Sequence, residues 1–184
     1  NIGNNAVGLY VKDNTITALN YGNIYAGTSA SPKNGAIGIF SEGGAGVENH
    51  GNITLYGNDV IGIAGKGAKK ITNFATITVE GENAVGIYGK NSPIYNSGDI
   101  KVGYYGVGIF GSESNVENHG NIISDAEGAI GLFIENGTLD NYGNVTLSGN
   151  SSMGIYANKG ATVTNYGIVT VNGDSSQGVY LNLA

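Results

Sequence analysis

The chain repeats one pattern about every 23 residues, and this repeat limits the folds available to it. Residues 84–103 show the unit, which reads AVGIYGKNSPIYNSGDIKVG. It holds an apolar stretch with a central glycine, a polar turn, an asparagine flanked by apolar and small residues, and a second alternating stretch. The glycine recurs at Gly8, Gly38, Gly62, Gly86, Gly108, Gly131, Gly154 and Gly178. A unit this short cannot bury its apolar face alone, so it must stack on its neighbours.

An asparagine in the middle of the unit keeps the same period. It recurs at Asn20, Asn49, Asn73, Asn96, Asn118, Asn141 and Asn165. Only the first repeat is longer than the others, and the asparagine column places the extra residues after Asn20. The small residues and the proline of residues 26–34 predict a surface loop there.

Side chains alternate across a strand, so we expect the residues on both sides of each glycine to face the core. The two columns are Val7, Ile37, Ile61, Val85, Val107, Ile130, Met153 and Gln177, and Leu9, Ile39, Ile63, Ile87, Ile109, Leu132, Ile155 and Val179. On this reading the glycines face outward beside an aromatic column. Its members form a candidate binding strip of Tyr10, Phe40, Tyr88, Phe110, Phe133, Tyr156 and Tyr180, with Ala64 in the same column. The rings could contact sugars, a host protein or another copy, or could stack on one another to stabilise the fold.

Each asparagine follows an inward apolar residue by two positions, so its side chain should also point inward. There an amide can donate and accept hydrogen bonds along the stack, and we predict a buried asparagine ladder. On this interpretation Asn118→Ala costs ~1 to 3 kcal/mol. The small residues two positions after each asparagine predict a positive φ or crowding against a neighbouring backbone. They are Gly22, Gly51, Ala75, Gly98, Gly120, Gly143 and Gly167.

Three short apolar stretches per repeat, with no helical period, predict an all-β fold. The architecture that stacks equivalent residues in this way is a right-handed parallel β-helix, here of about 7–8 rungs with three short strands per rung. We expect residues 1–184 to form a single repeat array that is a fragment of a longer β-helix.

Composition excludes several classes of function. The net charge is −6, and the only basic cluster is Lys69-Lys70, which argues against nucleic-acid binding. There is no cysteine and no apolar run of the ~20 residues that a membrane helix needs. We therefore expect no cofactor, no metal and no membrane insertion by this segment.

Catalytic signals are weak. Glu48 and Glu117 share a register but stand three rungs apart, or ~14 Å at ~4.8 Å per rung, which is too far for a carboxylate pair. Glu117 and Asp140 could be neighbours, although a solvated surface column explains them as well. His50 and His119 are also three rungs apart in a mainly aromatic turn column, so they cannot share a metal.

The repeats VENHGNITLYG, LDNYGNVTLSG and VTNYGIVTVNG, alternating with AVGIYG, GVGIFG or SMGIYA, resemble the passenger arrays of large type V autotransporter adhesins. The arrays of fusobacteria and related Gram-negative bacteria are especially similar. The resemblance covers essentially the whole chain. It implies a right-handed β-helix that is secreted and displayed on the bacterial cell surface.

Three functions follow as hypotheses. The leading one is a non-enzymatic adhesin passenger or stalk segment whose partner is a host-cell protein or glycan. The second is a polysaccharide-active enzyme, which a cluster of acidic residues on one face would favour. The third is a self-assembling extracellular filament in which the partner is another copy of the chain.

Overall fold

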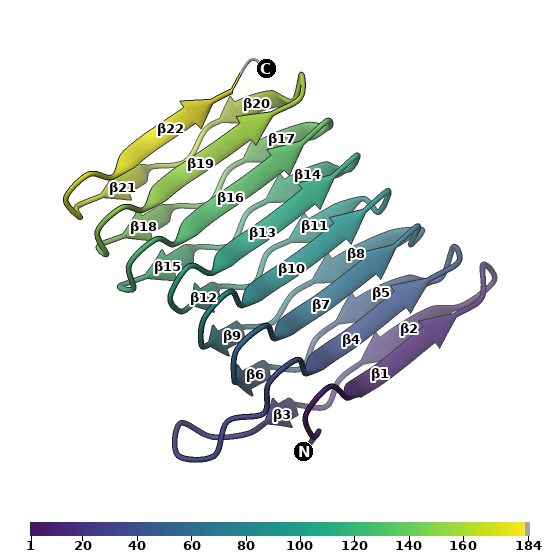
Figure 1. The fold of residues 1–184 in the computed structure, drawn as a ribbon. Coiled ribbons are helices and arrows are strands. Elements are labelled where there is room, and N and C mark those ends of the chain that lie inside the picture. Colours follow the sequence, from purple (N-terminus) through teal and green to yellow (C-terminus); the bar gives the residue numbers. More distant parts are fainter. Residues whose placement is uncertain (183–184) are drawn as a thin grey trace.

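The computed structural model describes residues 1–182 as a parallel β-helix of short strands and turns (Figure 1). The chain passes through three sheets in turn, and each circuit places a strand beside its equivalent one repeat earlier. The predicted parallel β-helix with three strands per rung is confirmed. Among the described residues there is no helix that could span a membrane.

Three parallel sheets form the walls of the solenoid. Sheet I contains β1 (Val7–Lys12), β4 (Ile37–Glu42), β7 (Ile61–Lys66), β10 (Val85–Lys90), β13 (Val107–Ser112), β16 (Ile130–Glu135), β19 (Met153–Asn158) and β22 (Gln177–Leu181). Sheet II contains β2 (Thr17–Asn20), β5 (Gly46–Asn49), β8 (Lys70–Asn73), β11 (Ile94–Asn96), β14 (Asn115–Asn118), β17 (Thr138–Asn141) and β20 (Thr162–Asn165). Sheet III contains β3 (Ile24–Ala26), β6 (Ile53–Tyr56), β9 (Ile77–Glu80), β12 (Ile100–Val102), β15 (Ile122–Ser124), β18 (Val145–Leu147) and β21 (Val169–Val171).

The strand register stacks equivalent residues of successive repeats. In sheet I, Ile87 pairs with Ile63 on one side and with Ile109 on the other. In sheet II, Asn96 pairs in the same way with Asn73 and Asn118. The 23-residue period therefore becomes columns of like residues along the axis.

The core is a continuous apolar column between the three sheets. Its largest fully buried side chains are Ile39, Ile53, Leu55, Ile63, Ile71, Ile77, Ile87, Ile100, Ile109, Ile122, Leu132 and Ile134. Five of them, Ile39, Ile63, Ile87, Ile109 and Leu132, belong to the column after the sheet I glycines, which alternation assigns to the inside. Each rung covers the core of the next, which is the packing that a repeat of this length requires.

The expected orientation of the sheet I glycines is wrong. A Cβ built on Gly108 would lie 2.6 Å from Cγ2 of the core residue Ile122, so this position faces inward. The preceding residue, Val107, is only partly buried, whereas Ile109 is fully buried. The glycine and the residue after it therefore both face the core, and the residue before the glycine faces outward. Glycine permits this break in alternation because it needs no space for a side chain.

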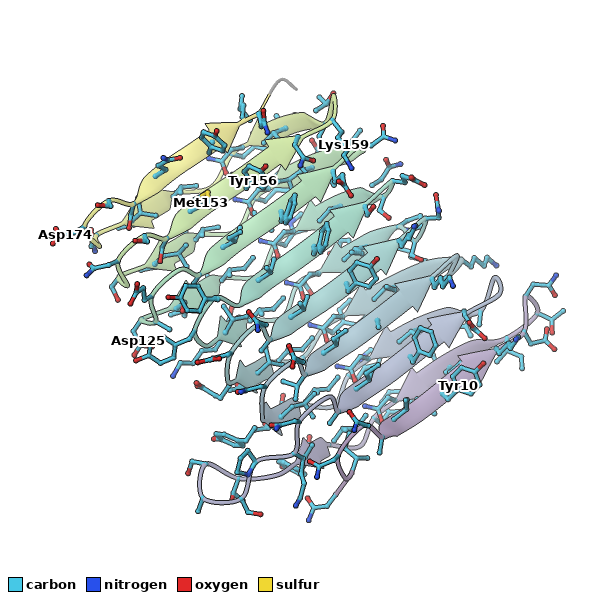
Figure 2. The ribbon with its side chains drawn as sticks, in the orientation of Figure 1. Tyr10, Asp125, Met153, Tyr156, Lys159 and Asp174 are labelled. Atoms are coloured by element: carbon cyan, nitrogen blue, oxygen red, sulfur yellow. The ribbon has the colours of Figure 1, made fainter. Side chains whose placement is uncertain are left out.

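The correction applies along the whole of sheet I. The column before the glycines is half-buried or exposed and lies on the same face as the aromatic column, as Figure 2 shows for Met153 and Tyr156 of β19. Its members are Val7, Ile37, Ile61, Val85, Val107, Ile130, Met153 and Gln177. The outer face of sheet I is thus more apolar than strict alternation predicts.

The small residues after the ladder asparagines are explained by crowding and not by a positive φ. A Cβ on Gly120 would clash with the carbonyl oxygen of Gly98 in the rung below. Positive φ angles occur instead in other turns, and one position with a positive φ recurs in every turn before a sheet I strand. The residues there are Asn5, Gly35, Asp59, Asn83, Tyr105, Gly128, Ser151 and Ser175.

The long first repeat forms a loop between β3 and β4. Figure 1 shows this loop projecting from the stack near the N-terminus. Thr28 and Ser31 exchange backbone hydrogen bonds of 3.1 Å in each direction. The loop rejoins the next rung where the Lys33 N–H donates to the Tyr56 carbonyl at 2.6 Å.

Candidate functional site

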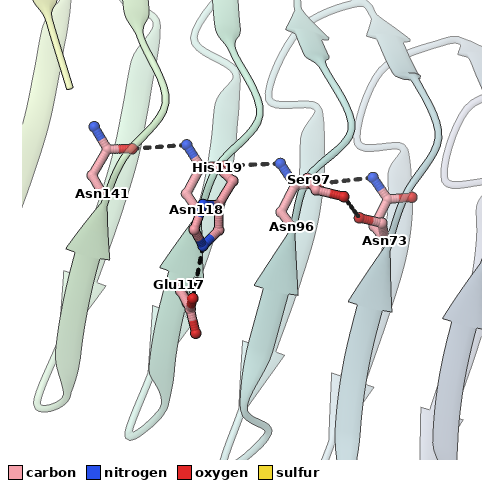
Figure 3. Close-up of polar contacts among 7 residues, drawn as sticks. All are labelled: Asn73, Asn96, Ser97, Glu117, Asn118, His119 and Asn141. Carbon is pink, nitrogen blue, oxygen red and sulfur yellow. Dashed lines mark hydrogen bonds and ion pairs between the residues drawn. The ribbon is translucent and has the colours of Figure 1, made fainter. Parts of the chain in front are cut away.

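The structure places the seven asparagines of the predicted ladder in one hydrogen-bonded column. Each Nδ2 donates to Oδ1 of the next asparagine at 2.7–2.8 Å, from Asn20 to Asn165. Each Nδ2 also donates to the carbonyl two residues later, as Asn118 does to Gly120 at 2.8 Å. Figure 3 shows four consecutive members, Asn73 to Asn141. From Asn20 to Asn141 both amide protons are used internally, so this column is a structural element.

A second column of rings lies at the turn after sheet II, and we call it the turn stack. Its seven members are Tyr21, His50, Phe74, Tyr95, His119, Tyr142 and Tyr166. Neighbouring ring centroids are 4.6–6.1 Å apart. In the rung that has Ser97 at the turn, the ring of Tyr95 fills the place. Four of the six contacts are stacked, so neighbours cover most ring faces, whereas Tyr95 is tilted against both of its neighbours.

The two histidines of the turn stack have the same surroundings. His50 Nε2 lies 2.7 Å from Glu48 Oε1, and His119 Nε2 lies 2.7 Å from Glu117 Oε1 (Figure 3). Each carboxylate precedes its histidine by two residues and orients the ring within the stack. Glu48 and Glu117 therefore have structural partners.

The candidate binding strip on sheet I is interrupted. Tyr10 stacks on Phe40 with centroids 5.7 Å apart, and then Ala64 leaves the column without a ring. Beyond this break the contacts run without interruption through Tyr88, Phe110, Phe133, Tyr156 and Tyr180, at 4.3–5.5 Å. Most of these rings are half-buried by one another. The strip is therefore two short clusters, and a binding role for it stays a prediction.

A hollow lies elsewhere, at the turns between sheets III and I. This groove has a volume of about 550 Å³. Its lining residues are Ser29, Pro32, Tyr56, Gly57, Glu80, Gly81, Gly103, Tyr104, Asp125 and Ala126. They come from the long loop and from four successive rungs.

Two departures from the repeat border this groove. From a ladder asparagine to the next sheet I glycine the spacing is 13 residues in five rungs, for example from Asn118 to Gly131. It is 18 from Asn20 to Gly38, because of the loop that supplies Ser29 and Pro32, and 12 from Asn96 to Gly108. The shortened turn, which begins at Gly103, lies between two rungs of normal length. Glu80 occupies the position equivalent to Gly103 in the rung before it, and Asp125 occupies that position in the rung after it. Gly103 takes the equivalent position in the shortened rung, so the hollow is lined there by a residue without a side chain.

The shortened turn also holds an unusual backbone conformation. Gly106 N–H donates to the Gly103 carbonyl at 3.2 Å, which closes a tight turn through Tyr104 and Tyr105. Tyr105 has a φ of 50°, although the equivalent residues of the other rungs are Asn, Asp, Ser or Gly. A left-handed conformation is strained for a bulky residue. Both tyrosines are more than half exposed, at 56% and 53%.

We expect Tyr105→Asn to stabilise the protein by about 1 kcal/mol. Strain of this kind costs ~1–3 kcal/mol, and asparagine adopts the left-handed conformation readily. Part of the gain is lost because the Tyr105 ring packs on Gly128 of the next rung. The midpoint of urea denaturation measures the change, with Asp59→Asn as a control at an already relaxed position. A lower midpoint for Tyr105→Asn would show that the ring contact outweighs the strain.

Lys101 lies on the outward side of β12, beside the groove, and pairs with one of the two carboxylates that line it. Its Nζ is 3.1 Å from Glu80 Oε1. This hydrogen bond raises the pKa of Lys101 above its usual value, and the nearby charges of Glu80 and Asp125 act in the same direction. Lys101 is therefore a firmly charged partner of the carboxylates and not a proton donor at neutral pH. With two carboxylates and one ammonium, the groove has an excess of negative charge.

Sequence reasoning missed the groove and also a second, outer ladder at the turn before sheet III. There the Asn23 side chain accepts the Asn52 N–H at 2.9 Å, and the Asn52 side chain accepts the Thr76 N–H at 3.2 Å. The pattern continues in later rungs through Asp99, Asn121 and Asn144. Each of these positions lies three residues after a ladder asparagine, so it keeps the same period. The outer ladder could therefore have been predicted from the repeat period alone.

Comparison with known families agrees with the fold. Residues 26–182 match the model of the BigA third pectate lyase-like domain, and the chain belongs to this family. BigA is a surface protein of the autotransporter type, so the match indicates a bacterial surface β-helix protein. No curated protein and no solved structure gives a significant match to the chain.

Proposed function

We propose that this chain is a non-enzymatic adhesin segment, displayed outside the bacterial cell, that contacts its partner through the groove lined by Glu80, Tyr104 and Asp125. The family match supports a bacterial surface location. The predicted resemblance to autotransporter adhesin passengers points to the same setting. The partner is a host-cell glycan or protein.

One observation carries the proposal. In the arc from sheet II to the next sheet I strand, both departures from the 13-residue spacing border the same hollow. A solenoid that served only as a spacer would need neither the loop nor the shortened turn. Exposed aromatic residues beside a few charged groups are the usual chemistry of a recognition site.

Binding of the purified chain to cells and to protein and glycan arrays tests this proposal. Tyr104→Ala should weaken binding about tenfold or more, since an exposed aromatic anchor is often worth ~2 kcal/mol. Tyr142→Ala, in the turn stack on another side of the solenoid, is the matched control. Circular dichroism establishes that each variant keeps its β-structure.

A third variant separates the groove from the strip on sheet I. Tyr88, Phe110 and Phe133 changed together to Ser should leave binding unchanged if the groove is the contact site. Loss of binding in this variant, with Tyr104→Ala unaffected, would move the site to the strip. Absence of any binding by the native chain would make this segment a stalk.

An enzyme is the second candidate, because Glu80 and Asp125 flank the groove two rungs apart. At ~4.8 Å per rung their backbones are separated by ~10 Å, close to the ~6.5–9.5 Å carboxyl spacing of inverting glycosidases. Against this reading, Glu80 is paired with Lys101. Assay of the incubated glycans for new reducing ends distinguishes the two candidates, and their appearance would favour the enzyme.

A further inference from the structure

We propose that the groove recognises an uncharged glycan, with the ring of Tyr104 against a sugar face and the carboxylates of Glu80 and Asp125 accepting hydroxyl hydrogen bonds. This inference rests on the proposed function, because it names the ligand class for the same groove.

The aromatic residues of the groove differ from those of the two ring columns. Among the described residues, Tyr56 and Tyr104 take part in none of the ring–ring contacts, whereas the turn stack covers its own ring faces. Tyr104 is 56% exposed and lines the hollow. An open aromatic face can pack against the C–H groups of a sugar ring, while its hydroxyl remains hydrated.

The charges of the groove select against acidic ligands. Glu80 and Asp125 contribute two negative charges, and Lys101 balances one of them. The whole chain adds a net charge of −6. A uronate or sialylated chain would bring like charges together, and like-charge contacts disfavour a partner strongly in a recognition site. An uncharged glycan instead supplies hydroxyl donors to the free carboxylate oxygens.

The backbone around the groove argues against a bound peptide strand. The Gly57 N–H donates to the Glu80 carbonyl at 2.8 Å, and the Gly103 N–H donates to the Val79 carbonyl at 3.1 Å. The Tyr56 carbonyl accepts from the backbone of the loop. These backbone groups are therefore used between rungs, and the groove has no open strand edge to which an extended peptide could add. Side-chain recognition is what the groove offers.

The size of the groove fits a short oligosaccharide. Its lining spans four rungs, from Tyr56 to Asp125, or ~14 Å at ~4.8 Å per rung. The volume of about 550 Å³ lies within the ~300–1,000 Å³ of typical ligand sites. Ser29 and Pro32 of the loop line the groove beside the Tyr56 rung, so a glycan would lie along the solenoid axis with one terminus at the loop.

A glycan array that carries uncharged and acidic glycans tests the ligand class. We expect the native chain to retain uncharged glycans and to reject uronates and sialylated glycans. Calorimetry with the best uncharged oligosaccharide of the array then measures the variants. Tyr104→Ala should weaken binding about tenfold or more, and Asp125→Asn several-fold. The controls Tyr142→Ala and Asp140→Asn, which lie outside the groove, should bind like the native chain.

The outcomes separate this inference from the proposed function. Retention of acidic glycans only, or of proteins only, overturns the uncharged-glycan inference. If Tyr104→Ala still abolishes such binding, the groove remains the contact site and the proposed function stands. If the native chain binds neither glycans nor proteins nor cells, both proposals fail. Binding to uncharged glycans that Tyr104→Ala leaves intact also overturns the inference, because the groove is then not the site.

Discussion

Gly108→Val is expected to destabilise the protein by more than ~3 kcal/mol. A Cβ at this position would lie 2.5 Å from the carbonyl oxygen of Gly131 and 2.6 Å from Cγ2 of Ile122. Neither contact can be relieved by rotating a surface side chain, because one atom is backbone and the other belongs to the packed core. Overpacking of a core commonly costs ~1–3 kcal/mol, and a backbone clash adds to that cost. Urea denaturation followed by circular dichroism measures the loss.

Gly178→Ala is the matched control for this prediction. It occupies the same column in the last described rung, and nothing lies within 4 Å of a Cβ built there. Its stability should change by less than ~0.5 kcal/mol. The pair of variants also discriminates between two orientations of the column. If Gly108→Val were tolerated as well as Gly178→Ala, the glycines would face outward, as strict alternation predicts, and the orientation described above would be wrong.

The sequence was sufficient to predict the fold because several residue types recur with the same period. Glycine and asparagine columns with the same spacing leave a stack of equivalent rungs as the simplest solution. The register then follows, since Asn96 must lie beside Asn73 and Asn118 for the columns to be continuous. Burial of residues such as Ile87 and Ile109 follows from alternation within each strand.

Alternation failed at the sheet I glycines for a local reason. A period of two assumes regular pleating, and glycine is the residue that allows the backbone to depart from it. In the register of sheet I, Val85 and Ile87 pair with Val107 and Ile109, while the glycines between them are not paired. The residue types in the column before the glycines did not reveal this departure, because valine and isoleucine suit either face of a half-covered strand.

The position of the groove could have been found from the spacing of the repeat, but the set of residues that line it could not. Twelve residues from Asn96 to Gly108, against thirteen in five other rungs, mark a deletion in the turn before sheet I. That the first-repeat loop reaches this same turn is a matter of three-dimensional packing. The loop is held there by the backbone hydrogen bond between Lys33 and Tyr56, which no sequence pattern indicates.

Asn118→Ala is expected to cost at least ~3 kcal/mol, the other large effect that the structure predicts. The Asn118 side chain is fully buried. It donates to Gly120 O and to Asn141 Oδ1, and accepts from Asn96 Nδ2, each at 2.8 Å. Truncation leaves three buried polar groups without their partner, and each such group costs ~1–3 kcal/mol. The cost therefore exceeds the value expected from one hydrogen bond.

Asn144→Ala separates the inner ladder from the outer one. Asn144 is exposed, and its Oδ1 accepts the Ile168 N–H at 3.1 Å, a bond that water can replace. Its loss should be below ~1 kcal/mol by the same denaturation measurement. Equal losses in the two variants would mean that burial does not strengthen the inner ladder. A much larger loss for Asn118→Ala would show that this column stabilises the solenoid from within, which leaves recognition to the turns that depart from the repeat.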